Sequence, residues 1–293
     1  MIDDDLQLKW MYLDDDGIVT TLPPITSLAD FHKAQRELGS VFFHANHALC
    51  PESDKLYFRG DDCGRPLGDN RRTSTNSLTR TFEEYRRCNN SRGETEWQTY
   101  IRMRHAGVLN TALLDWTASP EIALWFAIHE ADGSIKDLNS GVLWVYRYID
   151  EDERFPNNEE APIPPNGTTR SVVCLSYWEV ARSYYENDIS WGERPTMQKA
   201  AAVRLKFADA NDKGEQYLLP MDKDPYFRGR LIRIGIEGNY EFINAELNLW
   251  LEKEVLGRER LFSQYLALNN RQDESDYKIA RELNDTYRKE LSK

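Results

Sequence analysis

Runs of apolar residues alternate with polar segments along the chain, and their spacing predicts both strands and helices. Short runs rich in apolar and aromatic residues are typical of buried strands. The clearest of them cover residues 55–59, 111–116, 141–149, 200–207 and 229–236. Together with the preceding run SVFFHANHAL, the first is expected to form a buried strand that ends at Arg59. The 141–149 run is almost wholly apolar, so it is expected in the centre of a sheet.

Apolar residues at helical spacing predict α-helices between and after these strands. The predicted helices cover residues 27–38, 77–88, 94–107, 119–131, 245–256 and 276–291. Ser27 followed by Asp30 is typical of a capping box, Gly107 of a helix C-cap and Pro120 of a first helical turn. Residues 6–22 predict a hairpin that turns at Asp16-Gly17. Strands and helices mix without a strict β-α-β alternation, so the expected fold class is α+β.

The composition predicts a large core and an acidic surface. The 293 residues are 40% hydrophobic and 12% aromatic, which argues against disorder and favours one domain over the whole chain. The net charge of −12 argues against a broad basic surface for duplex nucleic acid. Six arginines between Arg71 and Arg92 leave a local basic cleft open, although such arginines more often form a solvated face.

The cysteines and the hydrophobicity of the chain indicate in which cell compartment the protein is expected. The four cysteines form no CxxC pair, which favours a reduced compartment over a disulfide framework or a zinc site. No signal-peptide-like start and no membrane-spanning run is present, so we expect a cytoplasmic protein with no membrane or metal site. The charged, proline-rich stretch 150–169 predicts a long surface loop, a lid or a partner-binding excursion.

The usual enzyme motifs are missing from the sequence. It contains no GxxxxGK[ST], no strand-GxGxxG-helix, no GxSxG and no HExxH. Arg59 is the first candidate site residue, because an arginine at the exit of a buried strand can aim its planar fork at a phosphate or carboxylate. Gly60 would let a ligand approach the backbone. Pairing of Arg59 with Asp61 or Asp62 at the sheet rim is equally consistent with the sequence.

A second group of candidates surrounds the next strand. Asp115 follows an apolar run and precedes a helix, so its carboxylate is expected either to cap that helix or to orient a neighbouring side chain. Thr117 or Ser119 can do the same capping. Trp116 is more typical of packing than of a stacking platform. His105, at a helix end just before this strand, is more often structural than functional, but its position keeps it a candidate.

These motifs resemble the FRG domain, a family named for its Phe-Arg-Gly motif, here Phe58-Arg59-Gly60. The resemblance continues through RHAGVLNTALLDWTASPEIALWFA, GVLWVYR and RPTMQKAAAVRLKF, and it covers roughly residues 31–262. FRG domains are in turn similar to the ADP-ribosyltransferase fold, a split two-sheet α+β core with flanking helices that clamps NAD. The resemblance therefore implies this fold, with the N-terminal hairpin and the C-terminal helix as additions.

The resemblance also implies roles for individual residues. Arg59, with Gly60, would hold NAD as the substrate, and Asp115 and Thr117 would lie at the site-facing end of the second strand. His105, Trp116 and Arg194 would line the NAD pocket. Gln198, or Glu193 instead, falls where the family fold has its catalytic glutamate. Glutamine hydrogen-bonds a ribose hydroxyl but cannot act as a base.

The implied activity is NAD-dependent ADP-ribosyl transfer to a macromolecule, either RNA or a protein, by a bacterial toxin or phage-defence effector. Such a toxin needs an inhibitory partner, an antitoxin, for which the 150–169 stretch is a candidate surface. The alternative is a non-catalytic module on the same scaffold that binds a nucleotide or a protein. The glutamine at position 198 supports that alternative.

Overall fold

The fold is α+β, as expected from the sequence. The computed structural model describes residues 12–13, 19–44, 55–62, 67, 74–88, 95–117, 119–130, 134–136, 141–148, 163, 172–174, 200–208, 217–253 and 271–291. These residues form six α-helices and eight β-strands. They divide into two compact units, each assembled from three stretches of chain: 1–67, 116–152 and 221–262 in the first, and 68–115, 153–220 and 263–293 in the second. The single-domain expectation stays a prediction.

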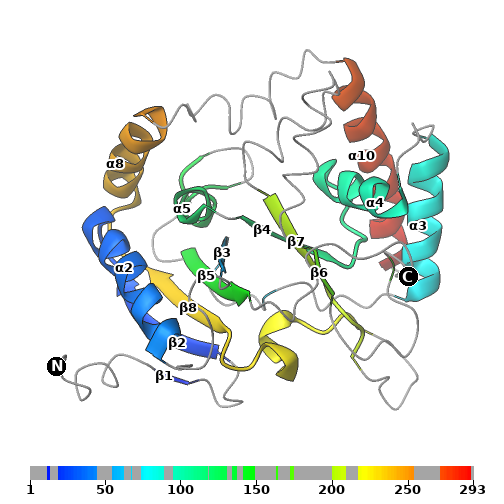
Figure 1. Ribbon diagram of the computed structural model, residues 1–293. Helices are drawn as coiled ribbons and strands as arrows, with labels where there is room; N and C mark the ends of the chain where they lie inside the picture. The colour runs from blue at the N-terminus through cyan, green and yellow to red at the C-terminus, as the bar shows by residue number, and fades with distance from the viewer. Residues whose placement is uncertain are drawn as a thin grey trace. The chain divides into compact units, whose positions relative to one another are not determined.

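The first unit is built on a mixed sheet with the strand order β1-β2-β8-β5-β3 (Figure 1). Its strands are β1 (Tyr12–Leu13), β2 (Val19–Ile25), β3 (Lys55–Asp62), β5 (Gly141–Tyr148) and β8 (Leu231–Ile236). Strands β2 and β8 run parallel, and the other pairs are antiparallel. The pairing of β1 with β2 confirms the predicted N-terminal hairpin, and β5 lies in the interior of the sheet as its apolar sequence predicted.

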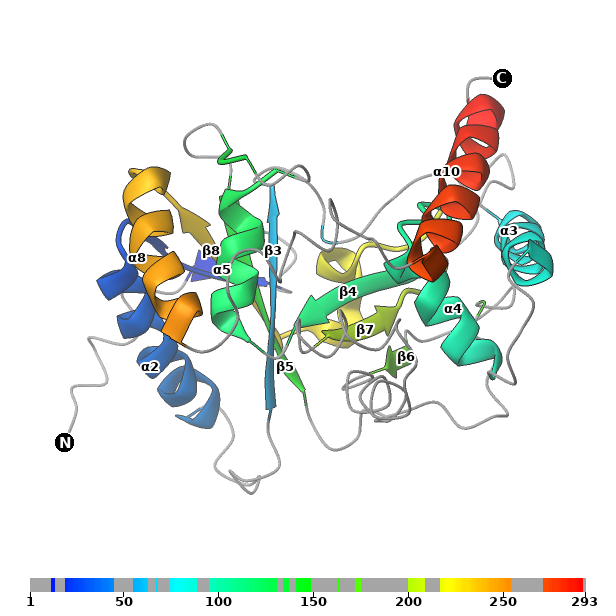
Figure 2. The ribbon, with the colours of Figure 1, turned by 90° about the horizontal axis from the view of Figure 1, so that it is seen from above.

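Three helices cover one face of this sheet (Figure 2). They are α2 (Leu28–His44), α5 (Pro120–Ile128) and α8 (Tyr240–Lys253). Their buried side chains form one core with the sheet residues Leu143, Val145, Ile232 and Ile234. Residues 142, 144 and 146 alternate with these and therefore face the other side. Two short helices, η3 (Met221–Lys223) and η4 (Pro225–Phe227), precede β8 in the chain. Phe227 of η4 packs edge-on against Tyr146 on this second face.

Two predictions about the 40–59 region were wrong. Residues 41–44 form the last turn of α2 instead of a strand, because a short apolar run fits a helix as well as a strand. Residues 45–49 lie outside the described residues. Strand β3 also continues beyond Arg59 to Asp62, because its pairing with β5 extends from Gly60↔Leu143 to Asp62↔Gly141.

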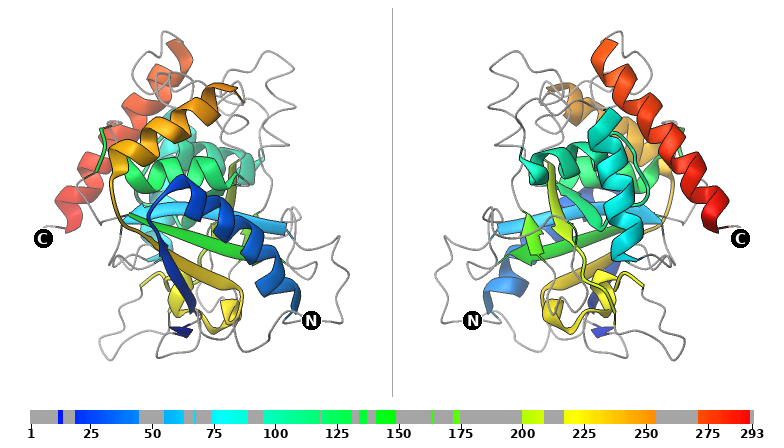
Figure 3. Two further views of the ribbon diagram at one scale, coloured as in Figure 1. Left: turned by 90° about the vertical axis from the view of Figure 1, so that its left-hand side faces the viewer. Right: turned by 90° about the vertical axis from the view of Figure 1, so that its right-hand side faces the viewer.

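The second unit combines three helices with three short strands. They are α3 (Thr75–Cys88), α4 (Glu96–His105), α10 (Arg271–Leu291), β4 (Leu113–Thr117), β6 (Val172–Cys174) and β7 (Ala200–Arg204). The last two residues of β4 belong to the first unit. Strand β7 lies between β4 and β6 and is antiparallel to β6. Helix α10 packs beside α3 (Figure 3, cyan and red) and buries Ala280, Leu283 and Tyr287.

The helix pattern in the sequence was largely right. The predicted helices at 77–88, 94–107, 119–131, 245–256 and 276–291 correspond to α3, α4, α5, α8 and α10. The packing of α10 on α3 shows that the C-terminal helix is part of the second unit. Within the described residues, no helix combines the length and apolar character that crossing a membrane requires.

Candidate functional site

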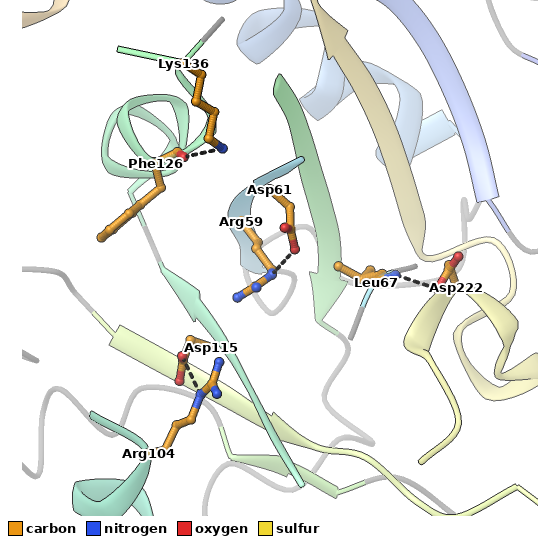
Figure 4. Close-up of polar contacts among 8 residues, drawn as sticks. All are labelled: Arg59, Asp61, Leu67, Arg104, Asp115, Phe126, Lys136 and Asp222. Atoms are coloured by element: carbon orange, nitrogen blue, oxygen red, sulfur yellow. Dashed lines mark hydrogen bonds and ion pairs between the residues drawn. The ribbon is translucent and has the colours of Figure 1, made fainter. Parts of the chain in front are cut away.

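Arg59 lies near the end of β3, on the face of the sheet opposite α5. Its Nε donates a hydrogen bond to Oδ2 of Asp61 at 3.0 Å (Figure 4). The two side chains point to the same face because they are two residues apart on one strand. They are 20% and 18% exposed, so the guanidinium is oriented by its partner and still reaches solvent. The predicted pairing of Arg59 with Asp61 is confirmed, and it does not remove Arg59 as a ligand-binding candidate.

Gly60 has a packing role that the sequence did not predict. A Cβ built at this position would overlap the backbone oxygen of Ala123 and the backbone nitrogen of Ala127, and would lie 2.9 Å from the Ala127 Cα. Gly141 on the neighbouring strand has a similar limit, with the Ala127 oxygen 2.6 Å from its Cβ position. Helix α5 therefore rests directly on two glycines. The space on this side of Gly60 belongs to a helix, and the expectation that a ligand approaches its backbone stays a prediction.

Thr117 lies on β4 next to β3, the strand that carries Arg59, because it pairs with Phe58 in the antiparallel register of the two strands. It is only 5% exposed, and its hydroxyl oxygen accepts a hydrogen bond from the Ser119 N–H at 3.0 Å. Ser119 is the N-cap of α5 and accepts from the Ile122 N–H. Capping therefore falls to Ser119, with Thr117 holding the turn that precedes it, and Asp115 does not cap α5.

Trp116 is packed in the core of the first unit. It is 3% exposed, and its ring lies 5.7 Å from that of Tyr146 at a tilt of 53°. This agrees with the packing interpretation drawn from the sequence. Its indole N–H is buried and has no hydrogen-bond partner among the described residues. An unsatisfied buried donor costs about 1–3 kcal/mol, so a bound acceptor at this position would be stabilising.

Asp115 belongs to the second unit and pairs with a residue of α4. Oδ2 of Asp115 accepts a hydrogen bond from Nε of Arg104 at 2.8 Å (Figure 4). The side chains are 21% exposed for Arg104 and 36% for Asp115. The carboxylate thus orients a neighbouring side chain, which was the second of the two predicted roles. Arg104 was missed as a site residue because the sequence does not show that α4 turns back alongside β4.

His105 is the last residue of α4, and nothing is described of its side chain. The helix ends in a Schellman motif, in which the Val108 N–H donates to the Met103 oxygen and the Gly107 N–H to the Arg104 oxygen. Gly107 has a φ of 90°, as the predicted C-cap requires. The backbone of His105 is therefore held at the C-terminal end of α4.

The entry into β4 is held by side chains from two helices. Asn284 of α10 accepts from the Leu109 N–H at 2.8 Å and donates to the Gly107 oxygen at 2.9 Å. The hydroxyl of Tyr100 accepts from the Ala112 N–H at 2.8 Å. Burial raises the pKa of the Tyr100 hydroxyl well above its ordinary value, so the tyrosine stays neutral. The polypeptide leading from His105 to Asp115 is thus fixed from both sides.

The remaining predicted site residues, Gln198, Glu193 and Arg194, lie outside the described residues. Within the first unit the structure brings Arg59, Gly60 and Thr117 together around the β3–β4 pairing. Within the second it brings Asp115 to Arg104, the residue before His105. Across the described part of the chain, no group of three or more His, Cys, Asp or Glu residues is placed to hold a metal ion.

Comparison with known proteins supports the resemblance to one family. The family model of the FRG domain matches residues 44–135, the segment that contains β3, α3, α4, β4 and α5. Arg59, Gly60, His105, Asp115 and Thr117 all fall within it. No curated protein and no solved structure matches the chain.

Proposed function

We propose that this protein is an NAD-dependent ADP-ribosyltransferase. The observation that carries the proposal is Arg59, a guanidinium oriented by Asp61 at 3.0 Å and partly open to solvent. It lies inside the segment that matches the FRG domain, and the FRG resemblance implies an NAD-clamping fold. A guanidinium held in this way is suited to a diphosphate, because its parallel N–H groups match two phosphate oxygens.

The proposed reaction breaks the bond between nicotinamide and the ribose C1′. Nicotinamide leaves with the bonding electron pair, the ribose passes through an oxocarbenium-like state, and a nucleophile of the acceptor bonds to C1′ and loses its proton. Arg59 would hold the dinucleotide in the reactive conformation, which is the main requirement of such a step. Roles for Asp115, His105, Trp116, Arg194 and Gln198 are proposed from the family resemblance alone.

The acceptor and the biological setting are also part of the proposal. The resemblance points to a macromolecule, RNA or protein, and to a toxin or defence effector that is restrained by an inhibitory protein. Helix α3 carries Arg80, Arg86 and Arg87 from the arginine-rich segment, and Arg86 and Arg87 lie in its last turn. Glu96 and Glu84 are the ion-pair partners of Arg86 and Arg87, so their positive charge is partly compensated.

The test is to incubate the purified protein with NAD labelled in the adenylate phosphate and with a cell extract. Transfer of label to a macromolecule and release of nicotinamide are expected, and nuclease or protease treatment of the product identifies the acceptor class. Arg59→Ala and Gln198→Ala should each abolish transfer. Arg228→Gln, which removes an exposed arginine on the turn after η4, is the matched control and should transfer like the wild type.

Two results would contradict the proposal. Label that stays on NAD, with a folded protein free of any inhibitor, would refute the transferase. Full activity of Arg59→Ala would refute the site even with transfer confirmed.

The second candidate is a non-catalytic nucleotide-binding module, favoured by the glutamine at position 198. It predicts that NAD binds in an Arg59-dependent manner while nicotinamide is never released.

A further inference from the structure

Arg59 belongs to a row of side chains that crosses three neighbouring strands of the first unit. In the antiparallel registers, Arg59 of β3 lies opposite Trp144 of β5, and Trp144 lies opposite Arg233 of β8. Residues directly opposite each other in such a ladder place their side chains on the same face. Because Gly60 faces α5, this row occupies the other face of the sheet.

The centre of the row is a buried donor. Trp144 is 3% exposed, and its indole N–H has no hydrogen-bond partner among the described residues. Indole is a donor only, and guanidinium groups are donors only. The polar groups of all three side chains in the row are therefore hydrogen-bond donors.

A glycine lies next to Arg233 on the face that carries the row. Gly235 follows Arg233 by two residues on the same face, and among the described residues a Cβ built there would meet only the Pro24 Cβ, at 3.8 Å. Arg233 and Gly235 are both partly exposed. Strands lie about 4.8 Å apart, so the Cα atoms of Arg59 and Arg233 are separated by roughly 10 Å. Two arginine side chains at that spacing can converge on one small anion.

We propose that Trp144 and Arg233 extend the Arg59 site into a binding row for the diphosphate of a dinucleotide. Arg59 and Arg233 bind the two phosphates from either side, and the Trp144 N–H donates to an oxygen between them. The identity of the dinucleotide as NAD rests on the proposed function. The diphosphate chemistry rests on the donors themselves.

The experiment follows binding directly, without any catalytic readout. Affinities for NAD, ADP-ribose and nicotinamide riboside, which lacks phosphate, are measured by calorimetry for the wild type, Trp144→Phe, Arg233→Gln and the control Arg228→Gln. Trp144→Phe keeps an aromatic ring and should weaken NAD and ADP-ribose about tenfold, as loss of a hydrogen bond to a charged acceptor does. Arg233→Gln should weaken them at least about tenfold. Arg228→Gln should have no effect, and nicotinamide riboside should not distinguish the variants.

A second measurement follows the wild-type protein and needs the Trp144→Phe variant only to assign one signal. The protein has eight tryptophans, and the Trp144 indole signal in a nitrogen-proton correlation spectrum is the one that Trp144→Phe removes. In the wild type, this proton should shift downfield when NAD or ADP-ribose is added. A purely structural tryptophan would keep its signal in place.

The outcomes distinguish a failure of the proposed binding row from a failure of the proposed transferase activity. Binding of NAD and ADP-ribose with a shifted Trp144 signal but no nicotinamide release would support the row and refute the enzyme. A different set of results would overturn the row alone. In that case nicotinamide release depends on Arg59, but the Trp144 signal does not move and the Trp144→Phe and Arg233→Gln variants bind with wild-type affinity. Absence of binding by either compound to the wild type would overturn both.

Discussion

Gly60 and Gly107 lie in different units of the molecule, and both fall within the segment that matches the FRG domain. Gly60 has no room for a side chain, because α5 occupies the space with its backbone. Gly107 has no atom of a described residue within 4 Å of its Cβ position, but its φ of 90° is one that other residues rarely adopt. One glycine is required by packing and the other by conformation.

The two arginine–aspartate pairs differ in a related way. Arg59 and Asp61 are neighbours on one strand, so their pairing orients a side chain without joining two elements. Arg104 and Asp115 join α4 to β4 and thereby fix the path of the chain between them. The first unit thus presents a side chain from a rigid sheet, whereas the second unit secures a turn. Substitutions at Gly60 and Gly107 can distinguish a requirement for space from a requirement for a particular backbone conformation.

The largest effect is expected from Gly60→Ala. Its Cβ would overlap the backbone of α5, which is bound to the rest of the core and cannot move alone, so we expect a loss of about 3 kcal/mol in the free energy of unfolding. Urea denaturation of the purified variant measures it. Gly235→Ala is the control on the same sheet. Among the described residues its Cβ would meet only the Pro24 Cβ, at 3.8 Å, so stability should change by less than about 1 kcal/mol. Equal effects of the two substitutions would contradict the packing explanation.

The next effect concerns the turn after α4. Asn284→Ala removes the hydrogen bonds to the Leu109 N–H and the Gly107 oxygen, and we expect a loss of about 2 kcal/mol. Amide hydrogen exchange should show that protection falls first at residues 107–112. Asp285→Ala on the exposed side of α10 is the control and should be nearly neutral. Unchanged exchange in the turn would show that α10 does not hold it.

Much of this arrangement could be predicted from the sequence, because local chemistry determines it. The C-cap at Gly107, the proline in the first turn of α5 and the apolar strand 141–148 each depend on a few neighbouring residues, and each was confirmed. The sequence also offered Asp61 as one of two possible partners of Arg59, and the structure selects it because two residues along a strand bring side chains to one face.

What could not be predicted depends on contacts between distant parts of the chain. The role of Gly60 is set by Ala123 and Ala127, more than sixty positions away, so the residues next to Gly60 in the sequence do not predict it. The run at 41–44 continues a helix because periodicity alone does not distinguish a short buried strand from a helical turn. Trp144 and Arg233 were missed as candidates for the same reason, since only the strand register places them beside Arg59.

Gly107 should tolerate the addition of a side chain better than Gly60 does. Gly107→Ala places a side chain in open space at a positive φ, so we expect a loss of about 1 kcal/mol from conformational strain alone. Gly107→Asn should lose less, because asparagine adopts this conformation more readily. At position 60 the order should reverse, with asparagine worse than alanine because it is larger. Denaturation of the four variants checks this order, and the same ranking at both positions would contradict the distinction.

The smallest effect distinguishes two helix starts, one in each unit, by their response to pH. At the start of α2, the Asp30 carboxylate accepts hydrogen bonds from the Thr26 and Ser27 hydroxyls and from the Thr26 N–H. At the start of α4, Thr95 and Gln98 form a capping box with no titrating group. Hydrogen bonds from the Thr26 and Ser27 side chains hold the pKa of Asp30 below its ordinary value. The folded state therefore gains stability above the pKa of an unfolded aspartate, about 3.9, and loses it as the pH falls through the lower folded value.

Asp30→Asn should lower stability at pH 7 by less than about 1 kcal/mol, since the site is solvent-exposed, and the difference from wild type should shrink towards pH 3. Gln98→Ala should lower stability by a similar amount that does not change with pH, because neither partner in its box ionises. Unfolding free energies of the three proteins at pH 7, 5 and 3 decide the matter. A deficit for Asp30→Asn that persists at pH 3 would assign its effect to shape instead of charge, and would remove the predicted difference in pH dependence between these two helix starts.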